Sequence, residues 1–249
     1  MNVIKNITTK IAIKCPYTMT PTRIVVHNTA NDASARSEVA YMNSNDKYTS
    51  FHYAVDDKEI VQGIEENRNS FNAGDGATGK GNRQGISIEI CYSKSGGDRF
   101  TKAEANAVHL IVAILKRHGW GIDKVTKHQD YSGKYCPHRT LDMGWQRFLN
   151  MIKEELEMRE EVEDLKRRVS ALEKGEVAVA TPTPIVKPTG KPKATPKGYS
   201  GSSVIDYLKS IGQDSSFKNR QALAKKHGIK NYIGLANQNS ALLRKMRGY

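Results

Sequence analysis

The clearest strand pattern in the chain is Gly85-Ile-Ser-Ile-Glu-Ile-Cys91. Its isoleucines alternate with a serine, a glutamate and a cysteine, which is the pattern of a β-strand with one apolar face. The glutamate, Glu89, is therefore expected on the face that points away from the isoleucines. A second apolar run, Arg23-Ile-Val-Val-His27-Asn28, predicts a buried strand with a histidine near its end.

Helical and extended patterns alternate around these two strands. The patterning predicts helices over 34–43, 101–118 and 141–157, a hairpin formed by 51–56 and 59–62, and a short strand within 121–127. The helix over 101–118 is expected to begin with Thr101 and Glu104 in capping-box spacing and to end at Gly119. Strands interspersed with helices indicate an α/β fold, with a mixed central sheet flanked by helices.

Composition divides the 249 residues into four segments. The expected domains are a globular domain over 1–150, a charged helix or short coiled coil over 151–174, a linker rich in Pro, Thr and Lys over 175–200, and a small basic all-α domain over 201–249. Prolines fix φ and remove backbone donors, so the linker is predicted to be extended and solvated. The last domain is short enough to be only marginally stable alone.

The positive charge is concentrated in the C-terminal part of the chain. The formal net charge is +13, and from Lys187 onward 13 Lys and Arg stand against Asp206 and Asp214 alone. Eleven of the 13 net charges therefore lie in that part. A nearly neutral body with a basic tail suggests that the tail binds a polyanionic partner.

Other bulk features exclude classes of protein. No stretch approaches the ~20 apolar residues that a membrane-spanning helix needs. The first ten residues lack the apolar core of a secretory signal peptide, so we expect synthesis and folding in a cytoplasm. The cysteines, Cys15, Cys91 and Cys136, are too few and odd in number for a disulfide framework. We expect reduced thiols, with Cys15 and Cys91 buried.

Segment 151–174 has apolar residues at heptad spacing. The d positions hold Met151, Met158, Leu165 and Leu172, and the a positions include Val162 and Val169. Charged residues fill the flanking positions, which suits a short coiled coil. Three heptads are marginal, so a homodimer through 151–174 and a single solvated helix remain open alternatives.

Chemistry-bearing residues gather in the run His128-Gln-Asp-Tyr-Ser-Gly-Lys134-Tyr-Cys136. His128 and Cys136, together with His27 on the predicted strand, make a three-ligand zinc site in outline. Structural zinc sites close with four protein ligands, whereas catalytic sites keep three and leave a position for water. The pattern therefore favours a metallohydrolase.

Several ordered motifs resemble one known family. They are Ile24-Val-Val-His27-Asn28, Phe51-His52-Tyr-Ala-Val-Asp56, Ala73-Gly-Asp-Gly76 with Gly81-Asn-Arg83, Ile86-Ser-Ile-Glu89, and His128 through Cys136-Pro137. Over roughly residues 10–155 the chain resembles the zinc N-acetylmuramoyl-L-alanine amidases of phage endolysins, chiefly those of Bacillus phages and prophages. That family shares its fold with peptidoglycan recognition proteins. Residues 201–249 are similar, over a shorter and less specific match, to a cell-wall-binding module found on such amidases.

The resemblance implies hydrolysis of the amide between N-acetylmuramic acid and the L-alanine of the stem peptide. It also implies a role for each site residue: zinc ligands His27, His128 and Cys136, general base Glu89, and oxyanion-stabilising Lys134. A lysin of this kind would accumulate in the host cytoplasm before it acts on the cell wall.

His52 and Arg83 are weaker candidates. His52 could approach the zinc or hydrogen-bond one of its ligands, and Arg83 could meet a carboxylate of the stem peptide. Many members of the family carry a catalytic tyrosine immediately before the residue that matches His52, whereas this chain has Phe51. The departure shifts the expected proton transfer toward Glu89 and Lys134.

The expected partners are bacterial peptidoglycan and, for the basic tail, anionic wall polymers; neither nucleic acid nor membrane is expected. Two other functions stay open: a non-catalytic protein of the same fold that binds peptidoglycan, and a nucleic-acid-binding protein that uses the tail. The intact set of ligands with Glu89 and Lys134 weighs against the first. The tail shows no recognised base-reading motif, which weighs against the second.

Overall fold

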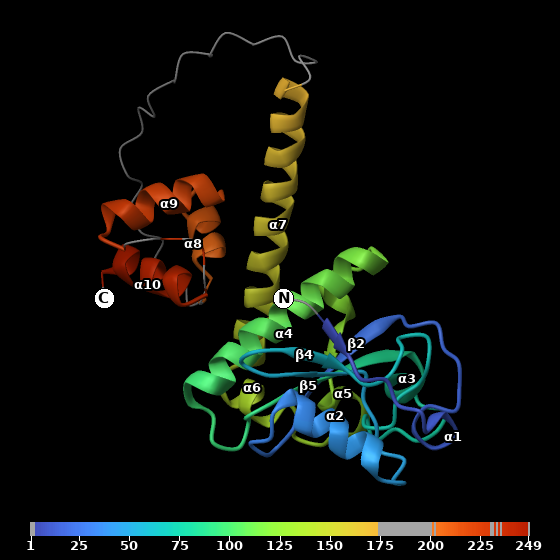
Figure 1. Ribbon diagram of the computed structural model, residues 1–249. Coiled ribbons are helices and arrows are strands. Elements are labelled where there is room, and N and C mark those ends of the chain that lie inside the picture. Colours follow the sequence, from blue (N-terminus) through green and yellow to red (C-terminus); the bar gives the residue numbers. More distant parts are fainter. Residues whose placement is uncertain are drawn as a thin grey trace. The chain divides into compact units, whose positions relative to one another are not determined.

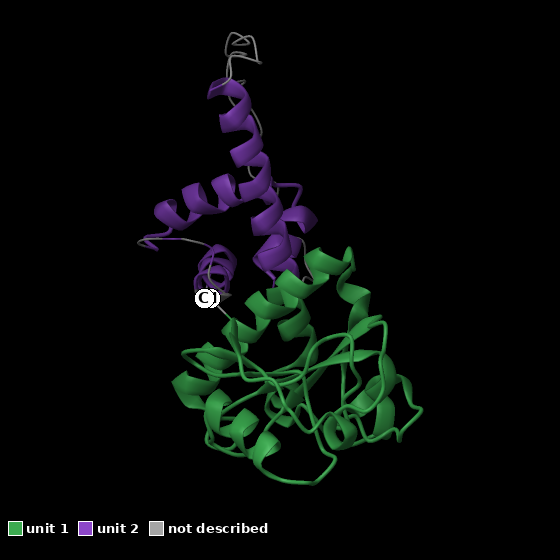
Figure 2. Cartoon of the chain, turned by 45° about the vertical axis from the view of Figure 1, so that its right-hand side comes forward, with its two compact units in different colours: residues 1–152 green, residues 153–249 purple. Residues whose placement is uncertain are grey.

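The computed structural model describes residues 3–173, 201, 203–229, 232, 234 and 236–248. The chain divides into two compact units, Met1–Ile152 and Lys153–Tyr249, which Figure 2 colours separately. The linker predicted over 175–200 lies outside the described residues.

The first unit is built on a six-stranded sheet (Figure 1). Its strands are β1 (Val3–Lys5), β2 (Arg23–Asn28), β3 (Tyr53–Val55), β4 (Ile60–Gln62), β5 (Gly85–Ile90) and β6 (Val125–Lys127). They lie in the order β1-β4-β3-β5-β2-β6. Strands β3 and β4 form an antiparallel hairpin and the other neighbours pair parallel, so the predicted mixed sheet is confirmed.

The two strands first identified in the sequence, β2 and β5, are adjacent and central. Every residue of β2 after Arg23 is buried, and the three isoleucines of β5 are fully buried. A strand inside a parallel sheet is covered on both faces, which explains why β2 is a continuous apolar run. Glu89 is the one residue of β5 that is only partly buried.

Helices flank the sheet. They are α1 (Ile11–Lys14), α2 (Ala35–Ser44), α3 (Lys80–Gln84), α4 (Gly97–His118), α5 (Gln129–Ser132), α6 (His138–Asp142) and the start of α7 (Trp145–Glu173), with a 3-10 turn at Ile122–Lys124. Helix α2 packs against β3 and β4, and α4 packs against β3 and β5. Ser34 caps α2 by accepting a hydrogen bond from the Ser37 N–H. None of the helices in the described part of the chain is long and apolar enough to cross a membrane.

The predicted start of α4 is wrong. The helix begins at Gly97, and the hydroxyl of Thr101 donates to the Gly97 carbonyl inside it. Glu104 does not reach back to the helix end, because its carboxylate is buried and forms an ion pair with Arg147 at 2.7 Å. A buried carboxylate needs a charged partner, and this requirement overrides the capping pattern. The predicted end at Gly119 is confirmed, with φ at 65° in the left-handed region.

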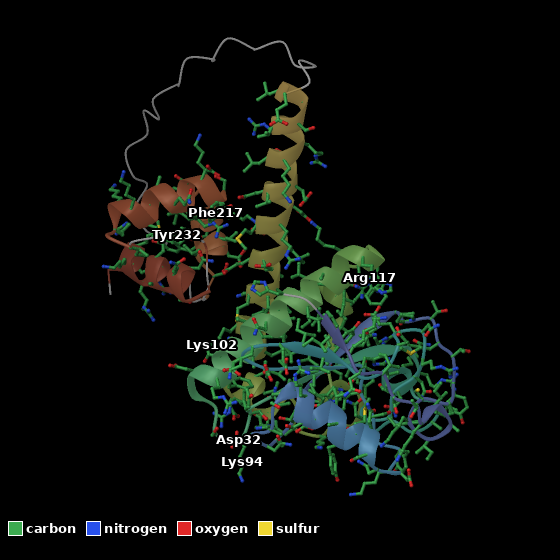
Figure 3. All side chains as sticks on the ribbon, in the orientation of Figure 1. Asp32, Lys94, Lys102, Arg117, Phe217 and Tyr232 are labelled. Atoms are coloured by element: carbon green, nitrogen blue, oxygen red, sulfur yellow. The ribbon has the colours of Figure 1, made fainter. Side chains whose placement is uncertain are left out.

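The second unit contains the rest of α7 and three more helices, α8 (Val204–Ser210), α9 (Phe217–Lys226) and α10 (Ala236–Arg247). Their buried side chains form one small core: Val204, Ile205, Tyr207, Leu208, Ala224, Tyr232, Leu242 and Leu243. The rings of Phe217 and Tyr232 stack with their centroids 6.1 Å apart (Figure 3). The predicted all-α C-terminal domain is therefore present.

A buried polar cluster joins α7 to these helices. Arg220, which is 1% exposed, donates to Oδ1 of Asn239, and the Tyr232 hydroxyl donates to the same oxygen. The Asn239 amide nitrogen in turn donates to Glu154 of α7 at 2.9 Å. Burial raises the pKa of Glu154 to about 7.

The heptad positions in the later turns of α7 are exposed. Val162, Leu165, Val169 and Leu172 are between 42% and 55% exposed. The segment is one continuous helix up to Glu173, and a dimer through it stays a prediction.

Candidate active site

Strand register brings the candidate residues to one edge of the sheet. His27 of β2 pairs with Glu89 of β5, and Val26 pairs with Lys127 of β6, the residue that precedes His128. The three strands run parallel, so their C-terminal ends meet at the same edge. Such edges are where α/β sheets place their ligand sites.

His27, His128 and Cys136 form a compact set of metal donors. All three are buried, and their donor atoms lie within 4.8 Å of one another. The Nδ1 atoms of His27 and His128 are 3.0 Å apart. Two nitrogens bound to one tetrahedral zinc lie about 3.3 Å apart. Because imidazole and thiolate are also ligand types that zinc favours, these residues fit the predicted ion.

The protonation states of the donors agree with that fit. Burial lowers the pKa of His27 well below 6.5 and that of His128 to about 4, and the nearby charge of Lys134 lowers both further. Both rings are therefore neutral at neutral pH and offer a lone pair. Burial raises the pKa of the Cys136 thiol to about 11, and the charge of Glu89 adds to the effect. The thiol would thus become a thiolate only beside a cation.

Asn28 fixes the segment that carries Cys136. Its Oδ1 accepts hydrogen bonds from the backbone N–H groups of Arg139 at 2.9 Å and Thr140 at 3.2 Å, in the first turn of α6. Asn28 therefore holds α6 against the end of β2. Sequence analysis missed this role because the bond to Arg139 spans 111 residues. The only signal in the sequence is its place directly after His27.

Glu89 lies beside the donors. Its Oε1 is 4.0 Å from Nδ1 of His27, and its side chain is 13% exposed. Burial raises the pKa of Glu89 to about 7, although a hydrogen bond from Asn72 opposes the shift. A carboxyl group that titrates near neutrality is suited to take up and release a proton.

A cleft of about 930 Å³ opens over the donors, which is the size of a small-molecule or peptide site. Glu89 and the exposed Lys134 both line it. Two exposed aromatic side chains, Tyr41 and Tyr48, also line it. Phe51 contributes a buried ring without a hydroxyl, as the sequence indicates.

The Gly-rich loop forms one wall of this cleft. Gly74 has a φ of 75°, and a Cβ at this position would lie 2.8 Å from the Ser132 Cβ and 3.3 Å from Nε2 of His128. Only glycine combines this backbone conformation with so close an approach. The loop thereby packs directly on a ring of the donor set.

The structure places His52 and Arg83 outside the donor set. Nδ1 of His52 accepts a hydrogen bond from the Ser87 N–H at 2.9 Å, and its Nε2 donates to the Arg68 carbonyl at 2.8 Å. Both nitrogens are thus taken up by backbone groups, and burial lowers the pKa of His52 to about 4. The guanidinium of Arg83 lies 4.3 Å from the centre of the Tyr17 ring, and Arg83 does not line the cleft.

Known proteins resemble this chain in sequence. Residues 17–139 match the family described as N-acetylmuramoyl-L-alanine amidase, and this span contains the three donors, Glu89 and Lys134. Two curated relatives are N-acetylmuramoyl-L-alanine amidases of Bacillus subtilis (strain 168). XlyB is 55% identical over 148 residues, which are 59% of this chain and 47% of XlyB. CwlA is 52% identical over 159 residues, which are 63% of this chain and 58% of CwlA.

The chain therefore spans about half the length of these curated relatives. A solved structure, that of PlyL, superposes with a TM-score of 0.60 and 50% sequence identity, over 61% of this chain and 97% of that chain. The family match lies within the first unit, where the sheet and the donors lie. Residues 17–139 of the chain therefore form a domain of the N-acetylmuramoyl-L-alanine amidase family.

Proposed function

We propose that the protein hydrolyses the amide bond between N-acetylmuramic acid and L-alanine in bacterial peptidoglycan, with zinc as its metal. The observation that carries this proposal is the convergence of three buried donors and Glu89 in one cleft of an amidase-family fold. A three-donor metal site beside an acid–base group, open to a cleft, is what hydrolysis of an amide requires.

The donors proposed to hold zinc are His27, His128 and Cys136. Zinc bound there would polarise the scissile carbonyl and lower the pKa of a water molecule. The chain prepares the donors in two ways: burial keeps the two rings neutral, and Asn28 fixes the helix that follows Cys136.

Glu89 is the proposed general base. It takes a proton from the attacking water while the water oxygen forms a bond to the carbonyl carbon. Glu89 then passes this proton to the nitrogen of L-alanine as the C–N bond breaks. The products are a carboxylate on the lactyl group and a free amine on the stem peptide.

Lys134 is proposed to stabilise the negative charge that develops on the carbonyl oxygen. Its position in the cleft and its effect on the pKa of His27 and His128 support this role, because both place its positive charge near the donors. Phe51 has no hydroxyl to share the proton transfer. We therefore assign the acid–base role to Glu89 and the electrostatic role to Lys134.

We further propose that the protein is a phage endolysin, held in the host cytoplasm before lysis and then degrading the wall. The basic domain over 201–249 is proposed to bind anionic wall polymers. Basic residues in the last turns of α9 and α10 support this: Lys225, Lys226, Arg244, Lys245 and Arg247. A second copy of the chain is the proposed partner for the exposed heptad positions of α7.

The first test is product release from purified Gram-positive cell walls. Free amino groups and reducing sugars are measured in parallel, with and without a chelator. New L-alanine amino termini without reducing ends, abolished by the chelator and restored by zinc, are the expected result. Reducing ends would show a glycosidase instead. Wall binding without any product would show a non-catalytic peptidoglycan-binding protein.

A further inference from the structure

Asn72, in the loop after β4, faces the end of β5. Its side-chain nitrogen donates to Oε1 of Glu89 at 3.1 Å and to Oγ of Ser87 at 2.6 Å. An amide nitrogen carries two hydrogens, so both are used. The nitrogen, rather than the oxygen, must face Glu89, because an ionised carboxylate only accepts hydrogen bonds.

The backbone beneath this side chain is fixed by its own loop. The N–H groups of Asn72 and Ala73 both donate to Oδ1 of Asn82, at 3.0 and 2.9 Å. Asn82 is 3% exposed, and its own N–H donates to the Asp75 carboxylate at 3.2 Å. The backbone that carries the Asn72 side chain is therefore held by hydrogen bonds within the loop itself.

The amide of Asn72 has one unpaired atom. The Oδ1 of Asn72 is buried and has no hydrogen-bond partner among the described residues. Burying an unpaired acceptor is destabilising. The Asn72 amide keeps one atom unpaired and still donates a hydrogen to Glu89. We therefore attribute its position to the interaction with the carboxylate.

We propose that Asn72 is the positioning residue of Glu89: it holds Oε1, the oxygen 4.0 Å from Nδ1 of His27, and so fixes the plane of the carboxylate beside the donor set. The proposal rests on the proposed role of Glu89 as general base. A carboxylate that rotates freely presents its oxygen to the attacking water in only some orientations, and proton transfer depends steeply on that geometry. Neither Asn72 nor Ser87 is a metal donor, so binding of the metal does not depend on this bond.

Two substitutions remove the donor in different ways. Asn72→Asp keeps the shape of the side chain, and Asn72→Ala removes it. Both are expected to lower kcat on a soluble muropeptide roughly 10- to 100-fold, the range for loss of a hydrogen bond to a charged group. The zinc content of the purified full chain is expected to stay within about twofold of wild type, since Asn72 is not a metal donor. Although Asn72 lines the cleft, the loss is expected in kcat rather than in KM, because its proposed role is to orient Glu89.

Asn106 supplies the matched control. Its side-chain nitrogen donates to the Asp56 carbonyl at 2.8 Å, and Asn106 does not line the cleft. Asn106→Ala should lower Tm while kcat stays at the wild-type value. A fall in kcat that merely follows Tm in all three variants would overturn the positioning role, and so would loss of zinc from the Asn72 variants.

A double-mutant cycle with Glu89→Gln separates this inference from the function on which it rests. When Glu89 is already Gln, removing Asn72 is expected to change the residual kcat less than twofold, because there is no base left to position. If Glu89→Gln is nearly inactive but the Asn72 variants keep wild-type kcat, the inference fails and the base assignment survives. If Glu89→Gln itself is fully active, both fail.

Discussion

Two partly buried glutamates, one in each unit, share the same local chemistry. Glu89 in the first unit and Glu154 in the second each accept a hydrogen bond from an asparagine amide, Asn72 at 3.1 Å and Asn239 at 2.9 Å. Burial raises the pKa of both carboxyl groups to about 7. By their pKa alone the two residues cannot be told apart.

What separates them is their surroundings. Glu89 lies 4.0 Å from a metal donor and lines a cleft, whereas Glu154 belongs to a closed cluster in which Arg220 and Asn239 are 1% and 2% exposed. A carboxyl group in a cleft can exchange its proton with a substrate, but one inside a helix interface can only affect packing. A raised pKa therefore identifies a catalytic residue only together with access and a neighbouring reactive group.

We expect the greatest loss of activity from Cys136→Ser, which distinguishes Cys136 from the two cysteines outside the donor set. Cys136→Ser should lose zinc and all measurable hydrolysis, because it removes the one thiolate among three donors. Cys15→Ser is the control: Cys15 is also a free, buried cysteine but lies outside the donor set. Elemental analysis and product release measured on both variants check this. Full activity in a zinc-free Cys136 variant would contradict the metal assignment.

The next largest loss is expected when Glu89, but not Glu154, is changed to glutamine. Glu89→Gln should lower kcat roughly 10²–10⁴-fold, the usual contribution of a general base, while fold and zinc content remain. Glu154→Gln makes the same chemical change at a carboxyl group with the same raised pKa and should leave kcat on a soluble muropeptide unchanged. Steady-state kinetics on the two variants decide the matter. Equal losses would mean that the cleft does not distinguish the two residues.

The sequence predicts those parts of the fold and site that depend on local pattern. The strands β2 and β5 follow from their apolar residues, and the end of α4 follows from Gly119, because each signal lies within the element that it defines. His27, His128 and Cys136 could be identified together because motif spacing and donor chemistry coincide. The structure then brings them to within 4.8 Å.

The parts that the sequence does not reveal depend on contacts between distant segments. The sequence pattern assigns Glu104 to a helix cap, whereas the fold pairs it with Arg147. The partner of Asn28 is identified only once α6 has folded against β2. The bond between Asn239 and Glu154 spans 85 residues. Side chains of this kind carry no periodic signal, because their partner is fixed only by the tertiary fold.

A third prediction assigns wall binding to the basic tail and hydrolysis to the first unit. Deleting residues 174–249 should weaken sedimentation with purified walls roughly tenfold or more, since the basic tail contributes the electrostatic attraction. Hydrolysis of a soluble muropeptide should change less than about twofold, because all donors and Glu89 lie in the first unit. Added salt should weaken wall binding of the full chain more than that of the truncated chain. Equal sedimentation of both proteins would exclude the tail as the wall-binding part.

The smallest effect is on stability and tests Glu154 as a packing residue. Its folded-state pKa of about 7 lies above the ordinary 4.5, so between these pH values the folded chain binds more protons than the unfolded chain. The contribution of Glu154 to stability is therefore fully favourable below about pH 4.5, declines as pH rises, and is lost above about pH 7. The decline is on the order of 3 kcal/mol, from 1.36 kcal/mol per pKa unit.

Glu154→Gln should remove this pH dependence, because the amide stays neutral at every pH and its oxygen can still accept the hydrogen bond from Asn239. Hydrogen exchange of α8, α9 and α10, compared between variant and wild type at the same pH, measures the difference without interference from the chemical exchange rate. The variant should gain protection at pH 8 and show almost none of that gain at pH 4. Glu163→Gln is the matched control, since Glu163 lies later on α7, forms an exposed ion pair with Lys166 at 3.0 Å and should show no such gain. A gain at pH 8 that is equally large for Glu163→Gln would reflect the overall charge of α7 rather than the burial of Glu154.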